Sequence, residues 1–346
     1  MKILILGDTH FSNNLPMSKY EDVIGGKLSH RLKLQSEVFE KTVTRNEDTT
    51  IIHLGDLFHS SKIDLFTTIF VSDVINDIVF NKNHHNNFYI LGGNHDYAGY
   101  DRFFSELIEK NDRIHIGDFD SINQDNKNVC FYGLSYYPLK VYKEKLDLIK
   151  QNLDESKINI LFTHQNIENF YINGIDIGGV PMIEFKKFDK VFNGHYHEPQ
   201  EKENITNVGS LYPLTFGDSN YRRVIEFDTN TMDIKEEKVQ SWEMETVKSE
   251  KDINLTECQK FIRLIVDNTK YNPQKKQEIE KQLSLDNCLG IQWETLLNDN
   301  EEITDSKNDF ILDMKNILSQ YVKNTANKEQ VKELIDVGLD ILNEIR

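Results

Sequence analysis

The chain has 346 residues, of which 38% are hydrophobic, and its formal net charge is −17. This length allows one large core and a smaller unit. No apolar run approaches the roughly 20 residues of a membrane-spanning helix, and Met1 and Lys2 lead into an expected strand without a signal peptide. We therefore expect an intracellular protein without membrane association, and its acidic balance disfavours tight DNA binding by the chain alone. The cysteines, Cys130, Cys258 and Cys288, show no CxxC spacing and are expected to be reduced.

The first part of the chain alternates apolar strands with amphipathic helices. Apolar residues recur at helical spacing over residues 31–43 and 65–80. Five apolar runs are typical of buried strands, at residues 3–6, 51–54, 88–91, 158–162 and 191–192. This alternation predicts a layered α/β domain over residues 1–242, with two sheets sandwiched between helices.

The rest of the chain is predicted to form smaller units. The polar stretch 243–254 is interpreted as a boundary, after which strands at 261–266 and 290–293 and a helix at 273–283 form a small α+β domain, residues 255–297. Residues 298–308 are acidic and polar, as in a linker. Apolar residues at spacings of three and four then predict a helical hairpin over residues 309–346. Whether this hairpin packs on the chain's own body or on a partner stays open.

Each predicted strand is followed directly by side chains that can bind a metal ion. In chain order these blocks are Asp8-Thr9-His10, Gly55-Asp56-Leu57-Phe58-His59, Gly93-Asn94-His95-Asp96, Thr163-His164 and Gly194-His195-Tyr196-His197. Because α/β proteins place their chemistry on loops at the carboxyl ends of strands, we expect the blocks to lie together. A single Asp-x-His or His-x-His arises by chance, whereas five blocks in consistent order after five strands indicate a site.

The donor atoms of these blocks suit two metal ions. They are carboxylate oxygens, one amide oxygen and imidazole nitrogens, from Asp8, His10, Asp56, Asn94, His164, His195 and His197. So many ligands exceed one tetrahedral ion and suit two ions that share a carboxylate, which we assign to Asp56. The first ion then takes Asp8, His10 and His197, and the second takes Asn94, His164 and His195. Two ions about 3.5–4 Å apart are suited to hydrolysis of a phosphate ester.

The histidines outside the blocks are expected to have no metal role. They are His30, His53, His84, His85 and His115. His53 lies within a predicted strand and is expected to be a hydrogen-bonded core residue. His84 and His85 stand in an Asn-rich polar stretch and are expected to be solvated.

In its five blocks the chain resembles the calcineurin-like metallophosphoesterase superfamily, whose blocks run Asp-x-His, Gly-Asp, Gly-Asn-His, His and Gly-His-x-His. Three segments resemble the Mre11/SbcD nuclease branch, with a spacing similar to the nuclease subunits of T4-type phages: residues 55–59, 208–211 and 216–218. The resemblance is specific over about residues 1–228. It departs at residues 11–14, where Phe-Ser-Asn-Asn replaces the usual Leu-Gly, so the substrate-facing loop is expected to differ.

The resemblance implies a metallophosphoesterase fold with a capping domain at residues 255–297, and a DNA nuclease that uses two divalent metal ions. Manganese suits the oxygen and nitrogen donors and the family's usage, while iron and zinc remain alternatives. The partners implied are DNA and a Rad50/SbcC-like coiled-coil ATPase, held by the hairpin at residues 309–346. A homodimer stays open.

The same resemblance suggests roles for three further residues. We expect His95 to protonate the leaving sugar oxygen, with Asp96 orienting its imidazole, and His59 to position the phosphate or the leaving strand. The alternative function is a phosphatase or cyclic-nucleotide phosphodiesterase, which would share all the metal ligands without needing His59.

Overall fold

The computed structural model describes residues 1–45, 49–80, 87–99, 102–103, 105, 108, 112–122, 128–172, 174–253, 259–266, 271–283 and 288–295. The chain divides into two compact units, residues 1–294 and 295–346. The predicted linker and helical hairpin, 298–308 and 309–346, lie outside the described residues, as do His84, His85 and Cys258. Within the described ranges, no helix combines the length and the apolar character needed to cross a membrane.

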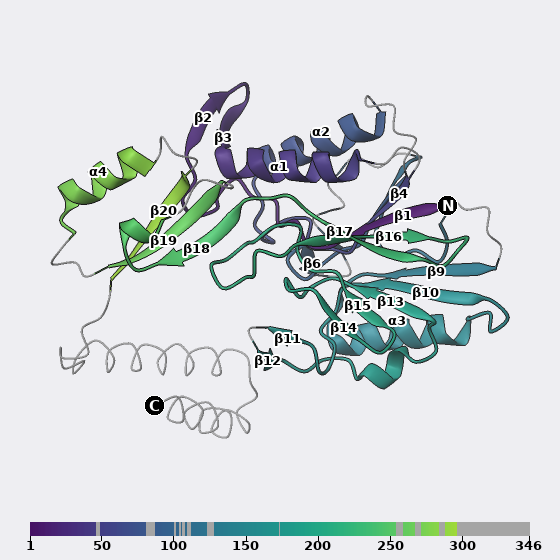
Figure 1. Cartoon of the computed structure of the whole chain (residues 1–346). Helices are drawn as coiled ribbons and strands as arrows, with labels where there is room; N and C mark the ends of the chain where they lie inside the picture. Colours follow the sequence, from purple (N-terminus) through teal and green to yellow (C-terminus); the bar gives the residue numbers. More distant parts are fainter. Residues whose placement is uncertain are drawn as a thin grey trace, which may run out of the picture. The chain divides into compact units, whose positions relative to one another are not determined.

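The first sheet has six strands in the order β17-β16-β1-β4-β5-β8 (Figure 1). Their bounds are β1 (Lys2–Leu6), β4 (Thr49–His53), β5 (Phe88–Ile90), β8 (Ile114–Ile116), β16 (Arg223–Asp228) and β17 (Ile234–Lys238). Strands β1, β4, β5 and β8 pair in parallel, whereas β16 and β17 are antiparallel to their neighbours. All five residues of β4 are buried, as expected of a strand covered on both faces.

The second sheet has five strands in the order β14-β15-β13-β10-β9. Their bounds are β9 (Val129–Leu134), β10 (Ile158–Thr163), β13 (Lys190–Asn193), β14 (Gln200–Lys202) and β15 (Ile205–Asn207). All neighbours are parallel except β14, which returns antiparallel to β15. The carboxyl ends of the parallel strands therefore share one edge of the sheet.

Helices cover the outer faces of both sheets, and the sheets pack on each other. The helices are α1 (His30–Val43), α2 (Leu65–Phe80) and α3 (Leu139–Gln151). Phe39 of α1 and Ile75 of α2 belong to one core with the outer face of the first sheet, and Tyr142 of α3 packs in a core beside the second. Between the sheets lies a third core that includes Ile52 and Phe162. The predicted two-sheet sandwich flanked by helices is confirmed.

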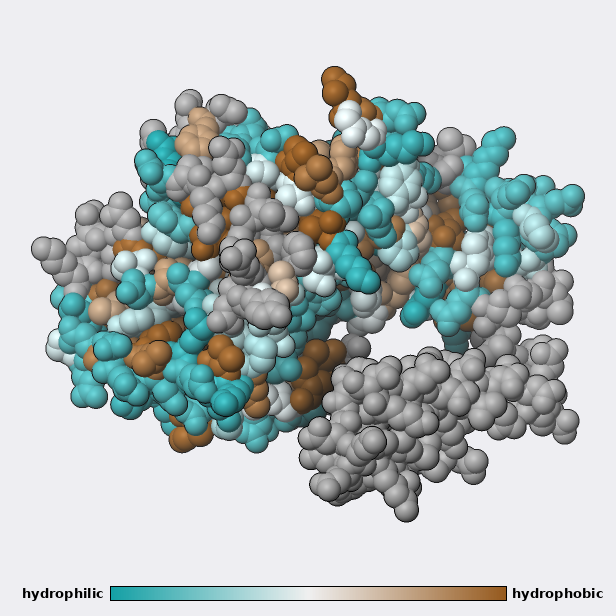
Figure 2. All heavy atoms as spheres, turned by 180° about the vertical axis from the view of Figure 1, so that it is seen from behind, coloured by the Kyte–Doolittle hydropathy of each residue, from teal (hydrophilic) through white to brown (hydrophobic). Residues whose placement is uncertain are grey.

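Short elements connect these layers. Three two-stranded hairpins are formed by β2 (Tyr20–Val23) with β3 (Gly26–Ser29), β6 (Tyr97–Gly99) with β7 (Arg102–Phe103), and β11 (Tyr171–Ile172) with β12 (Ile175–Asp176). Short 3₁₀ turns span Met182–Phe185 and Glu250–Asp252. Figure 2 shows a mostly hydrophilic face from which the apolar tip of the β2–β3 hairpin projects. Val23 and Ile24 of this tip line an open apolar groove together with Leu65 and Ile69 of α2.

A third sheet of three strands, β18-β19-β20, follows the two larger sheets along the chain. It consists of β18 (Glu243–Val247), β19 (Lys260–Val266) and β20 (Cys288–Thr295), with helix α4 (Pro273–Leu283) between the last two strands. The predicted helix and both predicted strands are present, whereas the stretch interpreted as a boundary contains β18, which pairs in parallel with β19. Only Met244 and Val247 of β18 are buried, so the sequence of this strand is mostly polar and does not indicate a strand.

Candidate metal centre

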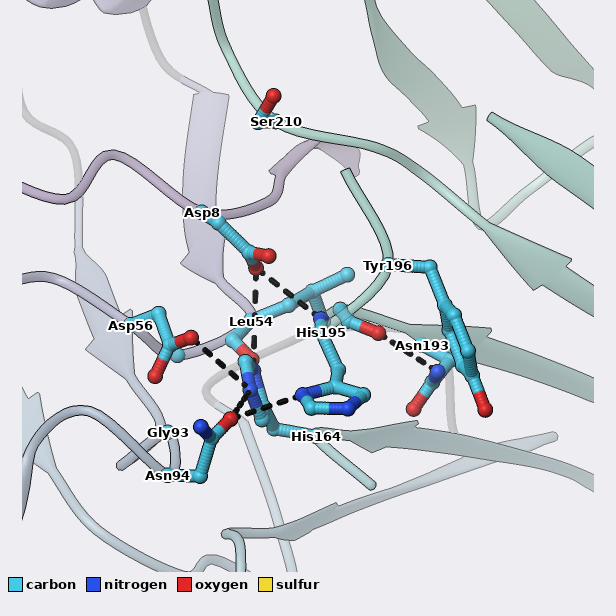
Figure 3. Close-up of polar contacts among 12 residues, drawn as sticks. Asp8, Leu54, Asp56, Gly93, Asn94, His164, Asn193, His195, Tyr196 and Ser210 are labelled. Carbon is cyan, nitrogen blue, oxygen red and sulfur yellow. Dashed lines mark hydrogen bonds and ion pairs between the residues drawn. The ribbon is translucent and has the colours of Figure 1, made fainter. Parts of the chain in front are cut away.

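The carboxyl ends of five strands bring the five blocks together. Asp8 and Asp56 follow β1 and β4, Asn94 follows β5, His164 follows β10, and His195 and His197 follow β13. Figure 3 shows carboxylates from the first sheet converging with imidazoles from the second around Asn94. All the ligands predicted from the sequence meet at this junction of the two sheets.

The donors fall into two groups that match the predicted division between two ions. Asp8, His10 and His197 offer ligand atoms within 4.8 Å of one another, and so do Asp56, His164 and His195. Asn94 joins the second group, because its Oδ1 lies 3.0 Å from Nε2 of His164 and 2.8 Å from Nδ1 of His195.

Asp56 lies between these two groups. Its Oδ2 is 3.5 Å from Nε2 of His10 in the first group and 3.4 Å from Nε2 of His164 in the second. Its Oδ1 accepts a hydrogen bond of 2.8 Å from the backbone N–H of His95. One carboxylate oxygen thus faces both donor groups, which suits a ligand shared by two ions.

The backbone of the site is held in unusual conformations. His10, Asp56 and His195 have φ angles of 45°, 53° and 81°, a region that non-glycine residues rarely adopt. Such conformations persist only where surrounding contacts impose them, and they cluster at functional sites. Gly93 illustrates the crowding, because a Cβ atom there would lie 2.1 Å from Oδ1 of Asp56. The sequence therefore uses glycine where the Asn94 loop crosses the bridging carboxylate.

The donor atoms fit a bound cation. Several buried polar atoms of the site make no hydrogen bond, namely Oδ2 of Asp8, both ring nitrogens of His10 and Nε2 of His195. Leaving such groups unsatisfied is costly in a folded protein, and cations would satisfy them. His164 donates its Nδ1–H to the carbonyl oxygen of Leu54 over 2.8 Å, so Nε2 is the ring atom that faces the other donors and would bind metal.

Burial and neighbouring charges shift the pKa values of the site. Burial lowers the pKa of His10 well below its usual range and that of His195 to about 3, so both imidazoles are neutral donors. Burial also raises the pKa of Asp8. For His164 burial opposes the charged form, but Asp56 outweighs burial and raises the pKa to about 9. Burial would likewise raise the pKa of Asp56, yet His164 and His10 hold it far below its usual range.

His59 and His95 stand at the rim of the centre. Their rings lie 5.4 Å and 4.7 Å from the ring of His10, and 5.8 Å from each other. The Nδ1 atom of His95 is 2.6 Å from the carbonyl oxygen of His59, which leaves Nε2 of His95 available. His59 is exposed and His95 is half-buried, so both side chains are within reach of a substrate.

The expected contact between Asp96 and the His95 imidazole is corrected by the structure. The Asp96 carboxylate is fully buried and accepts backbone N–H groups from Leu57, Phe58 and Gly93 at 3.0, 2.9 and 3.0 Å. Burial, and then the charge of Asp56, raise its pKa to about 7. Both oxygens of this carboxylate accept hydrogen bonds from the backbone of the Asp56 and Asn94 loops. Asp96 therefore orients these loops and not the His95 ring.

Two supporting residues were not assigned from the sequence. Oδ2 of Asp218 lies 3.6 Å from Nδ1 of His197 and, despite burial of that histidine, raises its pKa. Arg222 is fully buried and donates to the carbonyl oxygen of His197 over 2.6 Å. Asp218 belongs to the segment 216–218 noted for its resemblance, whereas Arg222 carries no sequence signal. His53 is confirmed as a buried residue that bonds Oγ1 of Thr9 at 3.0 Å.

Comparison with known proteins agrees with this geometry. The family model of calcineurin-like phosphoesterases matches residues 1–199, more than half of the chain. The chain belongs to this family. Its members are metal-dependent hydrolases, and the matched part of this phosphoesterase contains every predicted ligand.

Two viral proteins are among the relatives of this phosphoesterase. The chain is 28% identical over 229 residues to a protein named as phosphoesterase 244L of Invertebrate iridescent virus 6, covering 63% of this chain and 72% of the relative. It is 25% identical over 238 residues to exonuclease subunit 1 of Enterobacteria phage T4, covering 67% of this chain and 66% of the relative, slightly under two thirds. A solved archaeal phosphodiesterase aligns with 69% of this chain and 99% of its own, at 16% identity and a TM-score of 0.31.

Proposed function

We propose that this phosphoesterase is a two-metal DNA nuclease of the Mre11/SbcD type that acts in DNA recombination and double-strand break processing. One observation carries the proposal: the Asp56 carboxylate faces two donor groups, and the His59–His95 pair stands at their open rim. Similarity to exonuclease subunit 1 of phage T4 supports nuclease activity over the other activities of phosphoesterases.

The donor set suits two divalent ions, held by Asp8, His10 and His197 and by Asn94, His164 and His195, with Asp56 shared. When bound, such ions polarise a phosphate and supply the nucleophile at neutral pH. Oxygen and nitrogen donors without thiolate favour manganese, with iron and zinc as alternatives.

The chain's own histidines handle the leaving group in this proposal. Because Nδ1 of His95 is engaged by the His59 carbonyl, Nε2 is the atom that donates a proton to the leaving sugar oxygen as the P–O bond breaks. His59, which is exposed beside it, positions the nucleotide chain across the centre. Asp96 holds the Asp56 loop and the Asn94 loop together by accepting backbone hydrogen bonds from both.

The function is tested by comparing substrates. The purified full chain with manganese is incubated with labelled linear DNA, single-stranded circular DNA and a small phosphomonoester. We expect cleavage of DNA and negligible hydrolysis of the monoester. Rapid hydrolysis of the monoester with both DNAs intact would contradict the proposal and favour a phosphatase. Similarity to phosphoesterase 244L is compatible with that alternative function.

We further propose that a Rad50/SbcC-like ATPase binds the C-terminal segment and brings DNA to the centre. The support is the acidic charge of −17, which disfavours DNA binding by the chain alone, and the apolar spacing within residues 309–346. Replacing Leu318 and Leu339 with Glu, or ending the chain at residue 298, should abolish partner binding and ATP-dependent stimulation while basal manganese-dependent activity remains. Unfolding of the truncated chain would instead show that the segment belongs to the chain's own core.

A further inference from the structure

A cavity of about 180 Å³ borders two of the metal-site histidines, His195 and His197. Its other walls come from the β11–β12 hairpin, through Tyr171 and Ile172, and from the loop that contains Asp218. The volume is below the roughly 300–1,000 Å³ of pockets that enclose a whole ligand. It suits one unit of a polymer whose phosphate lies on the metal centre.

The β11–β12 hairpin exposes apolar side chains beside this polar centre. Tyr171 and Ile172 are each 39% exposed and Ile175 is 66% exposed. Scattered apolar residues are normal on a protein surface, but contiguous ones that rim a binding site indicate contact with a ligand. The hairpin thus offers the cavity an apolar wall.

The position of this wall is tied to the metal ligands. Phe170, directly before β11, is fully buried and packs on the ring of Tyr196 with centroids 5.6 Å apart. Tyr196 stands between His195 and His197 in the chain, and its hydroxyl donates to the carbonyl oxygen of Ile167 over 2.9 Å.

The neighbouring strand β14 holds the hairpin as well. The backbone N–H of Tyr171 donates to Oε1 of Gln200 over 2.9 Å, and Nε2 of Gln200 donates to the carbonyl oxygen of Tyr171 over 2.8 Å. Figure 1 shows the hairpin beside β14. These contacts hold the backbone of Tyr171 beside β14, so the ring is attached at a fixed point next to the cavity.

Charges around the cavity discriminate between the parts of a nucleotide. Glu198 and Asp218 are both in its lining, and both carboxylates are engaged, with Ser219 and Arg222 and with Thr215 respectively. These carboxylates repel a phosphate, so the cavity suits an uncharged group.

A cation stands just outside this cavity. The ammonium of Lys202 lies 4.5 Å from the centroid of the Tyr171 ring and forms no ion pair with any residue in the described ranges. An aromatic ring next to a cation is a combination by which proteins hold single-stranded nucleic acid, with a base on the ring and a phosphate on the cation.

We propose that Tyr171 and Ile172 form a base-binding wall, on which the nucleobase adjoining the cleaved phosphate stacks while Lys202 contacts the next phosphate. This inference rests on the proposed nuclease function and adds to it a preference for unpaired nucleotides. A base inside a duplex cannot offer its face to the ring, so the wall selects unpaired nucleotides and frayed ends. Tyr171 is thereby a specificity-determining residue that takes no part in the chemistry.

The test uses the full chain with manganese and two single-stranded oligonucleotides, one intact and one that lacks the base beside the cleaved bond. The ratio of their KM values measures what the base contributes. Loss of one stacked base corresponds to roughly 5- to 150-fold in affinity. We expect Tyr171→Ala to bring the ratio near one and Tyr171→Phe, which keeps the ring, to retain the ratio of the unaltered chain. Tyr221→Ala is the matched control, because Tyr221 is 46% exposed but outside the cavity.

Binding without turnover provides a second measurement. An oligonucleotide with 2-aminopurine at the same position should lose fluorescence when it binds the unaltered chain or Tyr171→Phe without added metal, and keep it with Tyr171→Ala. An unchanged KM ratio and unchanged quenching in Tyr171→Ala would contradict the proposed base-binding wall without affecting the nuclease proposal. If the unaltered chain cleaves neither oligonucleotide yet hydrolyses a small phosphodiester, the nuclease proposal fails, and the wall with it.

Discussion

The floor and the rim of the metal centre are built in opposite ways. On the floor, Asp8 and His164 are fully buried, and the backbone at Asp56 is held in a strained left-handed conformation. At the rim, His59 is exposed and Tyr171 is 39% exposed, and neither has a left-handed backbone. The floor is thus suited to holding ions in place, whereas the rim is suited to meeting a substrate. If this division is real, changes in the two regions should separate metal retention from catalysis.

The largest effect is expected on the floor, at Asp56. Asp56→Ala removes the oxygen that lies 3.5 Å from His10 and 3.4 Å from His164, so both donor groups lose a ligand. We expect loss of both metal ions and activity at background, measured by elemental analysis and DNA cleavage. The control Asp233→Ala changes an exposed aspartate outside the site and should retain both. Two ions retained by Asp56→Ala would exclude the bridging role.

At the rim, His95→Ala should keep both metal ions and lower turnover by roughly 10²–10⁴-fold, the usual contribution of a general acid. The reason is that the two ions are proposed to be held without His95, although His95 offers a ligand atom within 4.8 Å of those of His10 and His59. Metal content and turnover are measured on the same preparation, with His115→Ala as a histidine control. An ion lost from the His95 variant would place this residue on the floor.

His59→Ala sharpens the comparison within the rim. A positioning residue matters for a polymer that must be aligned, and misalignment costs on the order of 10²-fold. We expect such a loss in DNA cleavage and a much smaller one with a small activated phosphodiester. Equal losses on both substrates would remove the argument that His59 positions DNA.

Asp218→Asn tests a support of the floor. Its Oδ2 lies 3.6 Å from Nδ1 of His197, and partners of this kind typically contribute roughly 10- to 100-fold to metal affinity. We expect weaker binding of one ion, measured by titration calorimetry, with the other ion unaffected. Equal weakening of both sites would argue against the assignment of His197 to one ion.

The smallest effect concerns pH. In the metal-free chain, Asp56 outweighs burial and raises the pKa of His164 to about 9, so below this pH a metal ion must displace a proton from this ligand. The affinity for metal should therefore fall by about tenfold for each unit of pH below 9 for each proton released. Calorimetry in buffers of different ionisation enthalpy counts the protons. Affinity that is constant between pH 7 and 9 would show that His164 binds metal already neutral.

How much the sequence predicts differs between floor and rim for a physical reason. The ligands follow apolar strands such as 3–6 and 51–54, so residue type and position suffice to predict that they meet. The partner of Asp96 could not be predicted, because it consists of backbone N–H groups that any residue carries. The role proposed for Tyr171 could not be predicted either, because an aromatic residue in a two-residue hairpin strand gives no functional signal until the fold places it beside a metal ligand. Strand β18 was missed because two buried side chains do not produce a recognisable period.

The pairing of β1 has a consequence for how this chain is made. β1 is synthesised long before β16, yet it lies between β4 and β16 in the sheet, with Lys2 opposite Asp228. At roughly 5–20 residues per second, translation leaves that edge of β1 unpaired for about 10–50 s, and an open apolar edge is a site of aggregation. A fragment that ends at residue 199, where the family match ends, would contain every proposed metal ligand and still leave this edge open. The shortest stable domain should therefore extend through β17, to about residue 242.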